Sequence, residues 1–289
     1  MTGRAGSLAV FVCGAGRVGL AIARLARDRG MPVAGLWNPR PLRPDRAELA
    51  KPFRLMIGEF PSPVPADLWL ITVPDDAIAS VAERLIPVAG PRPKAAAHTA
   101  GALPGSLLHS LAAQGIACGS WHPAMTFLGT AADSEALAGA TAALEGEPAA
   151  LSVLTDFTRA LGISHVVLAA GLKPHYHAAL VLASNGRMAL DAAAAELLRA
   201  VGLEPATARS LLEPLVERTE RNLRRSGPAA ALTGPAARGD VRTVAVELEA
   251  LRDRPALDRL YRALAAVALD LVPPEVRGEG HYAVAERIR

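Results

Sequence analysis

The chain has 289 residues, of which 51% are hydrophobic and 20% are charged, with 31 lysines and arginines against 28 aspartates and glutamates. This length is enough for two domains with separate cores, and a formal net charge of +3 is too small to indicate a nucleic-acid partner. The two cysteines lack the spacing of a metal site, and no uncharged apolar stretch is long enough to span a membrane, so we expect a cytoplasmic protein with no metal site and no membrane segment.

The first predicted element is an apolar strand over Leu8–Cys13 that runs into a glycine-rich turn and then into a helical pattern. In such a G-x-G-x-x-G turn, the glycines form a tight bend, admit a pyrophosphate against bare backbone and pack the helix on the strand. The helix N-terminus adds free N–H groups and the positive end of the helix dipole. We therefore predict dinucleotide binding by Gly14, Ala15, Gly16, Arg17, Val18 and Gly19.

The end of the second predicted strand, Pro32–Trp37, indicates which dinucleotide is bound. An NAD enzyme places an acidic residue there for the ribose hydroxyls, whereas this chain has Asn38 and Arg40 and no carboxylate before Asp45. An arginine pairs with a ribose phosphate that an acid would repel. We predict NADP(H), with its 2′-phosphate near Asn38 and Arg40. In the alternative interpretation, arginine is merely abundant in this chain and these side chains are solvated.

Strands and helices then alternate along the chain, which is typical of an α/β Rossmann-type fold with a doubly wound, mainly parallel sheet. Ligands of such sheets bind beyond the carboxyl ends of the strands. Thr72, Val73, Pro74 and Thr99 lie at the carboxyl ends of expected strands and are predicted to line the nicotinamide side. The further strands are expected over Asp67–Val73, Lys94–Thr99, Gly115–Trp121, Ala140–Glu145 and His165–Leu168, and helices over Ala77–Leu85 and Ala149–Leu161.

Helical periodicity replaces this alternation from about residue 170 onward. We predict an NAD(P)-binding Rossmann domain over residues 1–168 and an all-helical substrate and dimerisation domain over 169–289, with the reaction in the cleft between them. Asp240 is expected to cap a helix and Gly227 to end one. Arg238 either binds a substrate carboxylate or pairs with Asp240.

The first helix of the second domain carries candidate catalytic residues. Helical spacing places Lys173 and His177 on one face, with Ser184 two turns further along it. Facing a nicotinamide, these side chains would bind a carbonyl or imine and exchange the proton that accompanies hydride transfer. His98 and His122 each end a strand near the same place. The alternative is an ordinary junction helix with a polar face, and histidines that only bond to backbone.

Six segments carry a family resemblance across nearly the whole chain: F-V-C-G-A-G-R-V-G, I-T-V-P-D-D-A-I, H-T-A-G-A-L, W-H-P-A-M-T-F, K-P-H-Y-H-A-A and L-T-G-P-A-A-R-G-D. The chain resembles the Rossmann-like oxidoreductases whose C-terminal domain of unknown function is numbered 2520. These proteins are relatives of pyrroline-5-carboxylate reductase, ketopantoate reductase and the β-hydroxyacid dehydrogenases.

The resemblance implies roles for individual residues. Lys173 matches the catalytic lysine of the hydroxyacid dehydrogenases and ketopantoate reductase, but His177 stands where those enzymes have a substrate-binding asparagine. The pair His122-Pro123 resembles the His-Pro turn of prephenate dehydrogenases. The resemblance also implies that the helical domain forms a homodimer.

The leading functional hypothesis is an NADP(H)-dependent oxidoreductase that acts on a small carbonyl, imine or hydroxy acid. A second hypothesis is a non-catalytic NADP(H)-binding sensor or regulatory dimer, which predicts cofactor binding without hydride transfer. A third is a reductase in which a deazaflavin-type carrier is the donor and NADP the acceptor. The sequence does not identify the substrate.

Overall fold

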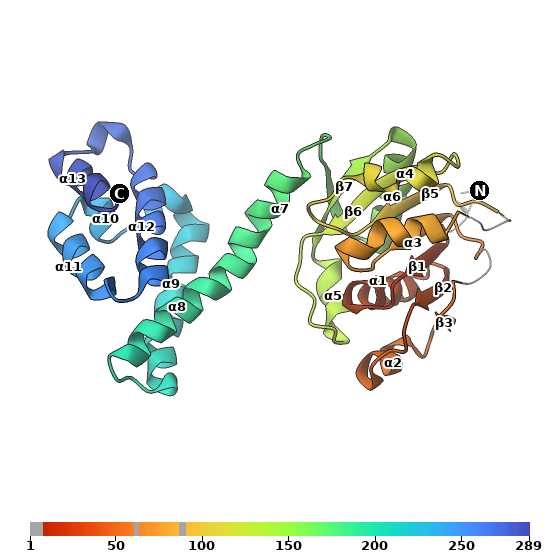
Figure 1. Cartoon of the computed structure of the whole chain (residues 1–289), viewed down its shortest axis with the longest axis horizontal. Coiled ribbons are helices and arrows are strands. Elements are labelled where there is room, and N and C mark those ends of the chain that lie inside the picture. The colour runs from red at the N-terminus through yellow and green to blue at the C-terminus, as the bar shows by residue number, and fades with distance from the viewer. Residues whose placement is uncertain (1–7, 61–63, 87–90) are drawn as a thin grey trace. The chain divides into compact units, whose positions relative to one another are not determined.

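The structure is a computed structural model that describes residues 8–60, 64–86 and 91–289 (Figure 1). The chain forms two compact units, residues 1–186 and 187–289. The domain boundary predicted after residue 168 corresponds to the end of the sheet, whose last strand finishes at Val167. The first unit nevertheless extends to residue 186, and the Lys173 side chain ties the helix α7 (Lys173–Val181) to the loops and strands of the sheet.

The first unit is built on one sheet of eight strands in the order β3-β2-β1-β4-β5-β6-β7-β8. Neighbouring strands are parallel except β6 and β7, which are antiparallel. This confirms the predicted Rossmann-type architecture, in which the sheet is mainly parallel. The strands are β1 (Val10–Cys13), β2 (Val33–Asn38), β3 (Leu55–Ile57), β4 (Leu68–Ile71), β5 (Ala95–His98), β6 (Ala117–Pro123), β7 (Thr141–Gly146) and β8 (Ser164–Val167).

Successive side chains of each central strand enter cores on opposite faces of the sheet. In β1, Val10 and Val12 join one core, whereas Phe11 and Cys13 join the other. Both faces of a sheet built from such strands are buried by helices, which explains why the strands read as continuous apolar runs. The free thiols of Cys13 and Cys118 are both buried in this way.

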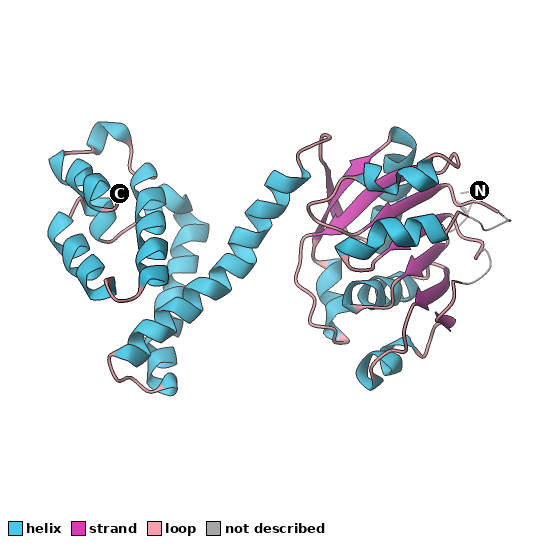
Figure 2. Cartoon of the chain, in the orientation of Figure 1, coloured by secondary structure: helices cyan, strands magenta, loops and turns pink. Residues whose placement is uncertain are grey.

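Helices lie on both faces of the sheet (Figure 2). The helices α1 and α6 pack with the core of Val10 and Val12, and α3 and α4 with the core of Phe11. The helical segments of the first unit that precede α7 are α1 (Arg17–Asp28), α2 (Pro44–Ala50), η1 (Asp75–Ala77), α3 (Ile78–Arg84), η2 (Gly105–Leu108), α4 (His109–Ala112), α5 (Ala132–Ala138) and α6 (Pro148–Leu161). After α7, residues Leu182–Gly186 form a π-helical segment, η3.

The second unit is entirely helical, as predicted for this part of the chain. Its core gathers Val244 and Leu248 with side chains of the last two helices. Asp240 caps α11 by accepting a hydrogen bond from the backbone N–H of Thr243 at 3.1 Å, and α9 is interrupted at Gly227, where φ is +76°. The helices are α8 (Arg187–Ala200), α9 (Pro205–Ala231), α10 (Pro235–Arg238), α11 (Val241–Leu251), α12 (Pro255–Asp270), η4 (Pro274–Val276) and α13 (Glu279–Arg287). Across the described residues, no helix combines the length and the apolar character needed to cross a membrane.

Candidate functional site

The glycine-rich turn between β1 and α1 has the geometry of a dinucleotide loop. Gly14 has φ +123°, which only glycine adopts easily, and its N–H donates to the carbonyl of Trp37 at 2.7 Å. A Cβ on Gly19 would lie 1.9 Å from the carbonyl oxygen of Gly14. At Gly16, by contrast, a Cβ would meet no atom within 4 Å. The first and third glycines are therefore required by packing, whereas Gly16 leaves open space at the start of α1.

Two side chains hold this loop from neighbouring strands. The Thr72 hydroxyl donates to the carbonyl of Gly14 at 2.6 Å, and Asn38 Oδ1 accepts from the N–H of Ala15 at 3.1 Å. Asn38 Nδ2 also donates to the carbonyl of Arg40 at 2.6 Å, while the Arg40 side chain is exposed. Asn38 thus holds the backbone that borders the predicted phosphate pocket. Arg40 lies beside this pocket, and its side chain is exposed to solvent.

His98 is a candidate catalytic residue from the sequence, but both of its ring nitrogens contact backbone groups. It is fully buried, its Nδ1 accepts from the N–H of Ala100 at 3.2 Å and its Nε2 lies 2.9 Å from the carbonyl of Pro104. Burial lowers the pKa of His98 to about 4. The imidazole is therefore neutral near pH 7, and it fixes the turn that follows β5.

Lys173 also lies away from solvent. Only 1% of the residue is exposed, and Nζ donates to the carbonyl of Ala100 and to the hydroxyl of Ser120, both at 2.8 Å. Burial lowers its pKa to about 8, although Glu145 and Asp75 favour the charged form. Lys173 and His177 do not form the predicted line of side chains toward a ligand, because Lys173 at the start of α7 points into the protein interior.

His122 and His177 come together with Tyr176, which sequence reasoning missed. The Tyr176 hydroxyl and His122 Nδ1 form a hydrogen bond of 3.0 Å, and the rings of His122 and His177 lie edge to face with centroids 5.7 Å apart. Burial, with the nearby charge of Lys173, lowers the pKa of His122 to about 4, and burial raises the pKa of Tyr176. Both groups are neutral near pH 7 and are able to donate or accept hydrogen bonds.

Gly101 provides the surface on which the two imidazoles lie. A Cβ at this position would be 2.1 Å from His177 Cδ2, 2.7 Å from His177 Nε2 and 2.9 Å from His122 Nε2. The Nε2 atoms of both histidines therefore converge on this glycine, and no larger residue would leave them in place.

A cavity of about 300 Å³ opens beside these imidazoles. Ser184 and Asn185 supply hydroxyl and amide groups to its wall, and Met125, Leu180 and Val181 supply apolar surface. Ser184 reaches the cavity from the π-helical segment η3, whose wider turn changes the helical phase from that assumed in the prediction. All these residues belong to the first compact unit.

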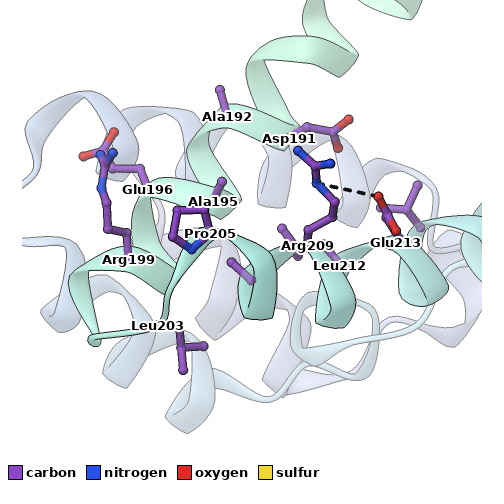
Figure 3. A pocket seen from close by; sticks show the side chains of 12 residues that line it. Asp191, Ala192, Ala195, Glu196, Arg199, Leu203, Pro205, Arg209, Leu212 and Glu213 are labelled. Carbon is purple, nitrogen blue, oxygen red and sulfur yellow. Dashed lines mark ion pairs between the residues drawn. The ribbon is translucent and has the colours of Figure 1, made fainter.

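A larger cavity of about 660 Å³ lies between α8 and α9 in the second unit (Figure 3). Ala192, Ala195 and Leu212 line it, and Arg209 and Glu213 form an ion pair of 3.8 Å at its edge. It contains no histidine, and its lining is mainly apolar. Elsewhere in this unit, Arg238 Nη2 lies 3.9 Å from Asp240, which is a loose ion pair.

Residues 140–268 match the domain of unknown function DUF2520. This confirms the resemblance for the C-terminal part of the chain. Among solved structures, protein TM1727 from Thermotoga maritima is 21% identical with a TM-score of 0.69, covering 93% of this chain and 100% of that one. BF3122 from Bacteroides fragilis, a presumed NADP oxidoreductase, is 22% identical with a TM-score of 0.70, covering 91% and 98%.

A third similar structure is a Plasmodium falciparum pyrroline carboxylate reductase with NADP bound. It is 12% identical to this chain with a TM-score of 0.57, and the match covers 92% of this chain and 98% of that one. Likeness at these identities establishes the shared fold. No curated protein matches the chain.

The DUF2520 segment contains α7 and β7, whereas the dinucleotide loop, His98 and His122 precede it. Besides Tyr176, sequence reasoning missed Ser120, Gly101 and Glu145. Gly101 and Tyr176 stand inside two of the motifs that carry the resemblance, so a closer reading of those motifs would have included them. Glu145 has no such signal, because a single acid at the end of a strand usually faces solvent.

Proposed function

We propose that this chain is an oxidoreductase that uses NADP(H) to transfer hydride to or from a small carbonyl, imine or hydroxy acid. The observation that carries the proposal is the open space at Gly16, between two glycines that packing requires and in front of the first turn of α1. A pyrophosphate fits such a place because bare backbone N–H groups and the helix dipole face it. The buried free thiols of the two cysteines agree with a reducing, cytoplasmic location.

The cofactor would be held by residues at the ends of four strands, β1, β2, β4 and β5. Gly14, Ala15, Gly16, Arg17, Val18 and Gly19 would surround the pyrophosphate, and Asn38 and Arg40 the 2′-phosphate. Thr72, Val73, Pro74 and Thr99, at the ends of β4 and β5, would border the nicotinamide. The exposed guanidinium of Arg40 supports NADP(H) over NAD(H), since it is free to pair with a phosphate.

The bound nicotinamide supplies or accepts the hydride, and His122 and His177 would hold the reacting oxygen or nitrogen. His177 lines the cavity and is half-buried, so we assign the exchange of the accompanying proton to it. Tyr176 fixes the ring of His122 through Nδ1, and Ser184 would contact the substrate from the cavity wall. The predicted location of the reaction between the two domains stays a prediction.

Titration of the purified protein with NADPH and with NADH, followed by fluorescence, tests the cofactor assignment. We expect NADPH to bind at least about tenfold more tightly, which corresponds to about 1.4 kcal/mol. The Arg40→Ala variant should lose this preference because it lacks the guanidinium that pairs with the phosphate. Arg225→Ala, an exposed arginine of α9 in the second unit, is the matched control and should keep it.

A screen of carbonyl and imine compounds, which follows the absorbance of reduced nicotinamide, then tests the reaction. Tight NADPH binding without turnover of any class of substrate would favour the sensor hypothesis. Tighter binding of NADH would contradict the phosphate pocket, and binding of neither dinucleotide would contradict the proposal as a whole.

We also propose that the second unit forms a homodimer. The helices α8 and α9 expose large apolar side chains, including Met188 at 61%, Leu211 at 54% and Leu215 at 62% exposure. Such surface is costly to leave in water, and a mainly apolar cavity lies between the same two helices (Figure 3).

Sedimentation velocity should therefore find a dimer at micromolar protein, and Leu215→Glu should shift it to a monomer. Leu128→Glu is the control, because Leu128 is 76% exposed on a loop of the first unit and should leave the dimer intact. A monomeric wild-type protein, or a dimer that Leu215→Glu does not weaken, would contradict this assembly.

A further inference from the structure

Four buried polar side chains converge on the turn that follows β5. His98, Ser120, Lys173 and Glu145 are 0%, 0%, 1% and 7% exposed, and they come from β5, β6, α7 and β7 respectively. Buried polar groups are costly unless they are hydrogen-bonded, so a cluster of this kind constrains the backbone that it contacts.

Two of these side chains bond directly to the backbone of the turn, and a third bonds to the first residue of η2, where the turn ends. Lys173 Nζ donates to the carbonyl of Ala100 at 2.8 Å, His98 Nδ1 accepts from the N–H of the same residue at 3.2 Å, and Glu145 Oε2 accepts from the N–H of Gly105 at 2.6 Å. Lys173 also donates to Ser120 on β6 at 2.8 Å. The ammonium therefore joins the turn to the neighbouring strand.

The imidazoles of the candidate site, those of His122 and His177, lie against the same turn. Gly101 follows Ala100 directly, and its α-carbon faces His177 Nε2 and His122 Nε2 so closely that a methyl group would not fit. A displacement of Ala100 and Gly101 would accordingly displace both rings. Lys173 and His177 are four residues apart on α7. Through Lys173 this helix holds the turn, and through His177 it places an imidazole against Gly101 of the same turn.

We propose that Lys173 is a positioning residue, whose buried ammonium holds the Ala100–Gly101 turn and thereby the Nε2 atoms of His122 and His177. Its role in a reaction rests on the function proposed above, but its hold on the turn does not. With 1% exposure and two short hydrogen bonds to protein acceptors, Nζ is not placed to protonate a substrate. The sequence pattern predicts instead that Lys173 binds the reacting oxygen or nitrogen of the substrate.

The ammonium also acts on the imidazoles through its charge. The positive charge of Lys173 contributes to the low pKa of both His122 and His98. Removal of that charge should raise the pKa of His122, because a nearby cation disfavours the protonated ring. A lysine that only filled space would not have this effect.

The experiment compares Lys173→Met with wild type in the full-length protein, without cofactor or substrate. Methionine has a similar length but has neither the charge nor the N–H donors. We expect amide hydrogen exchange in residues 99–105 to accelerate at least about tenfold, as local opening becomes easier. The pKa of His122, followed by NMR of the imidazoles, should rise. Lys94→Met is the control, since the Lys94 side chain is exposed and pairs with Asp67.

If Lys173→Met does not fold, Ser120→Ala provides the same test. It retains the ammonium and removes one of its two acceptors, so exchange in residues 99–105 should rise by a smaller factor. Unchanged exchange in the turn together with unchanged histidine titrations, in whichever variant folds, would overturn the proposal. These readouts need no turnover, so they hold even if the proposed oxidoreductase activity fails.

Once a substrate is known, steady-state kinetics of Lys173→Met give a second readout. We expect kcat/KM to fall by about tenfold or more, because the imidazoles lose their position. A wild-type kcat/KM in this variant would overturn our assignment.

Discussion

Replacing Gly16 by alanine should weaken NADPH binding at least about a hundredfold, or about 2.7 kcal/mol, and leave the melting temperature within about 1 °C of wild type. A Cβ on Gly16 would meet no protein atom within 4 Å, and the Gly16 backbone has a φ of −79°, which any residue adopts. The fold therefore tolerates the methyl group. A pyrophosphate against the backbone would not, because the methyl group occupies the place where the phosphate oxygens approach the N–H groups.

Gly19→Ala is the matched comparison within the same turn. There the Cβ would lie 1.9 Å from the carbonyl oxygen of Gly14 and 2.6 Å from the Thr72 hydroxyl. We expect this variant to lose thermal stability as well as NADPH binding, since the helix is forced away from the strand. Fluorescence titration and thermal denaturation of both variants separate the two roles. Wild-type affinity in Gly16→Ala would show that no pyrophosphate lies in this turn.

Much of the fold could be predicted because local patterns determine it. Strands such as β1 and β4 are short apolar runs bounded by turn residues, and α1 follows directly on a glycine pattern whose geometry is known. The strand β3 was missed because none of its three residues is fully buried and three residues carry too short a pattern. The antiparallel pairing of β6 with β7 was missed because strand direction depends on contacts that are distant in sequence.

The candidate site could be predicted only in part. The ends of β5 and β6 placed His98 and His122 in one region, since parallel strands end at the same edge of a sheet. Periodicity gave the face of α7 that carries Lys173 but not the depth to which its long side chain is buried. The π-helical turn at Ser184 and the buried carboxylate of Glu145 depend on tertiary contacts, so no local pattern indicates them.

Replacing Gly101 by alanine should abolish most of the proposed turnover and leave the cofactor in place. The added Cβ would lie 2.1 Å from His177 Cδ2 and 2.9 Å from His122 Nε2, so both rings must move. Displacement of reacting groups by about 1 Å is able to cost on the order of a hundredfold in rate, and we expect kcat to fall by about that factor. NADPH affinity should stay within about twofold of wild type, because the dinucleotide loop is untouched.

Gly139→Ala is the control for the added methyl group. Gly139 follows α5 with φ −92°, and a Cβ there would lie at an ordinary 3.6 Å from the carbonyl of Ala136. Its turnover should match that of wild type. NMR of the imidazoles, without substrate, should show displaced His122 and His177 resonances in Gly101→Ala alone. Displaced resonances with unchanged turnover would exclude both histidines from the reaction, because the alanine would then have moved them at no cost to the chemistry.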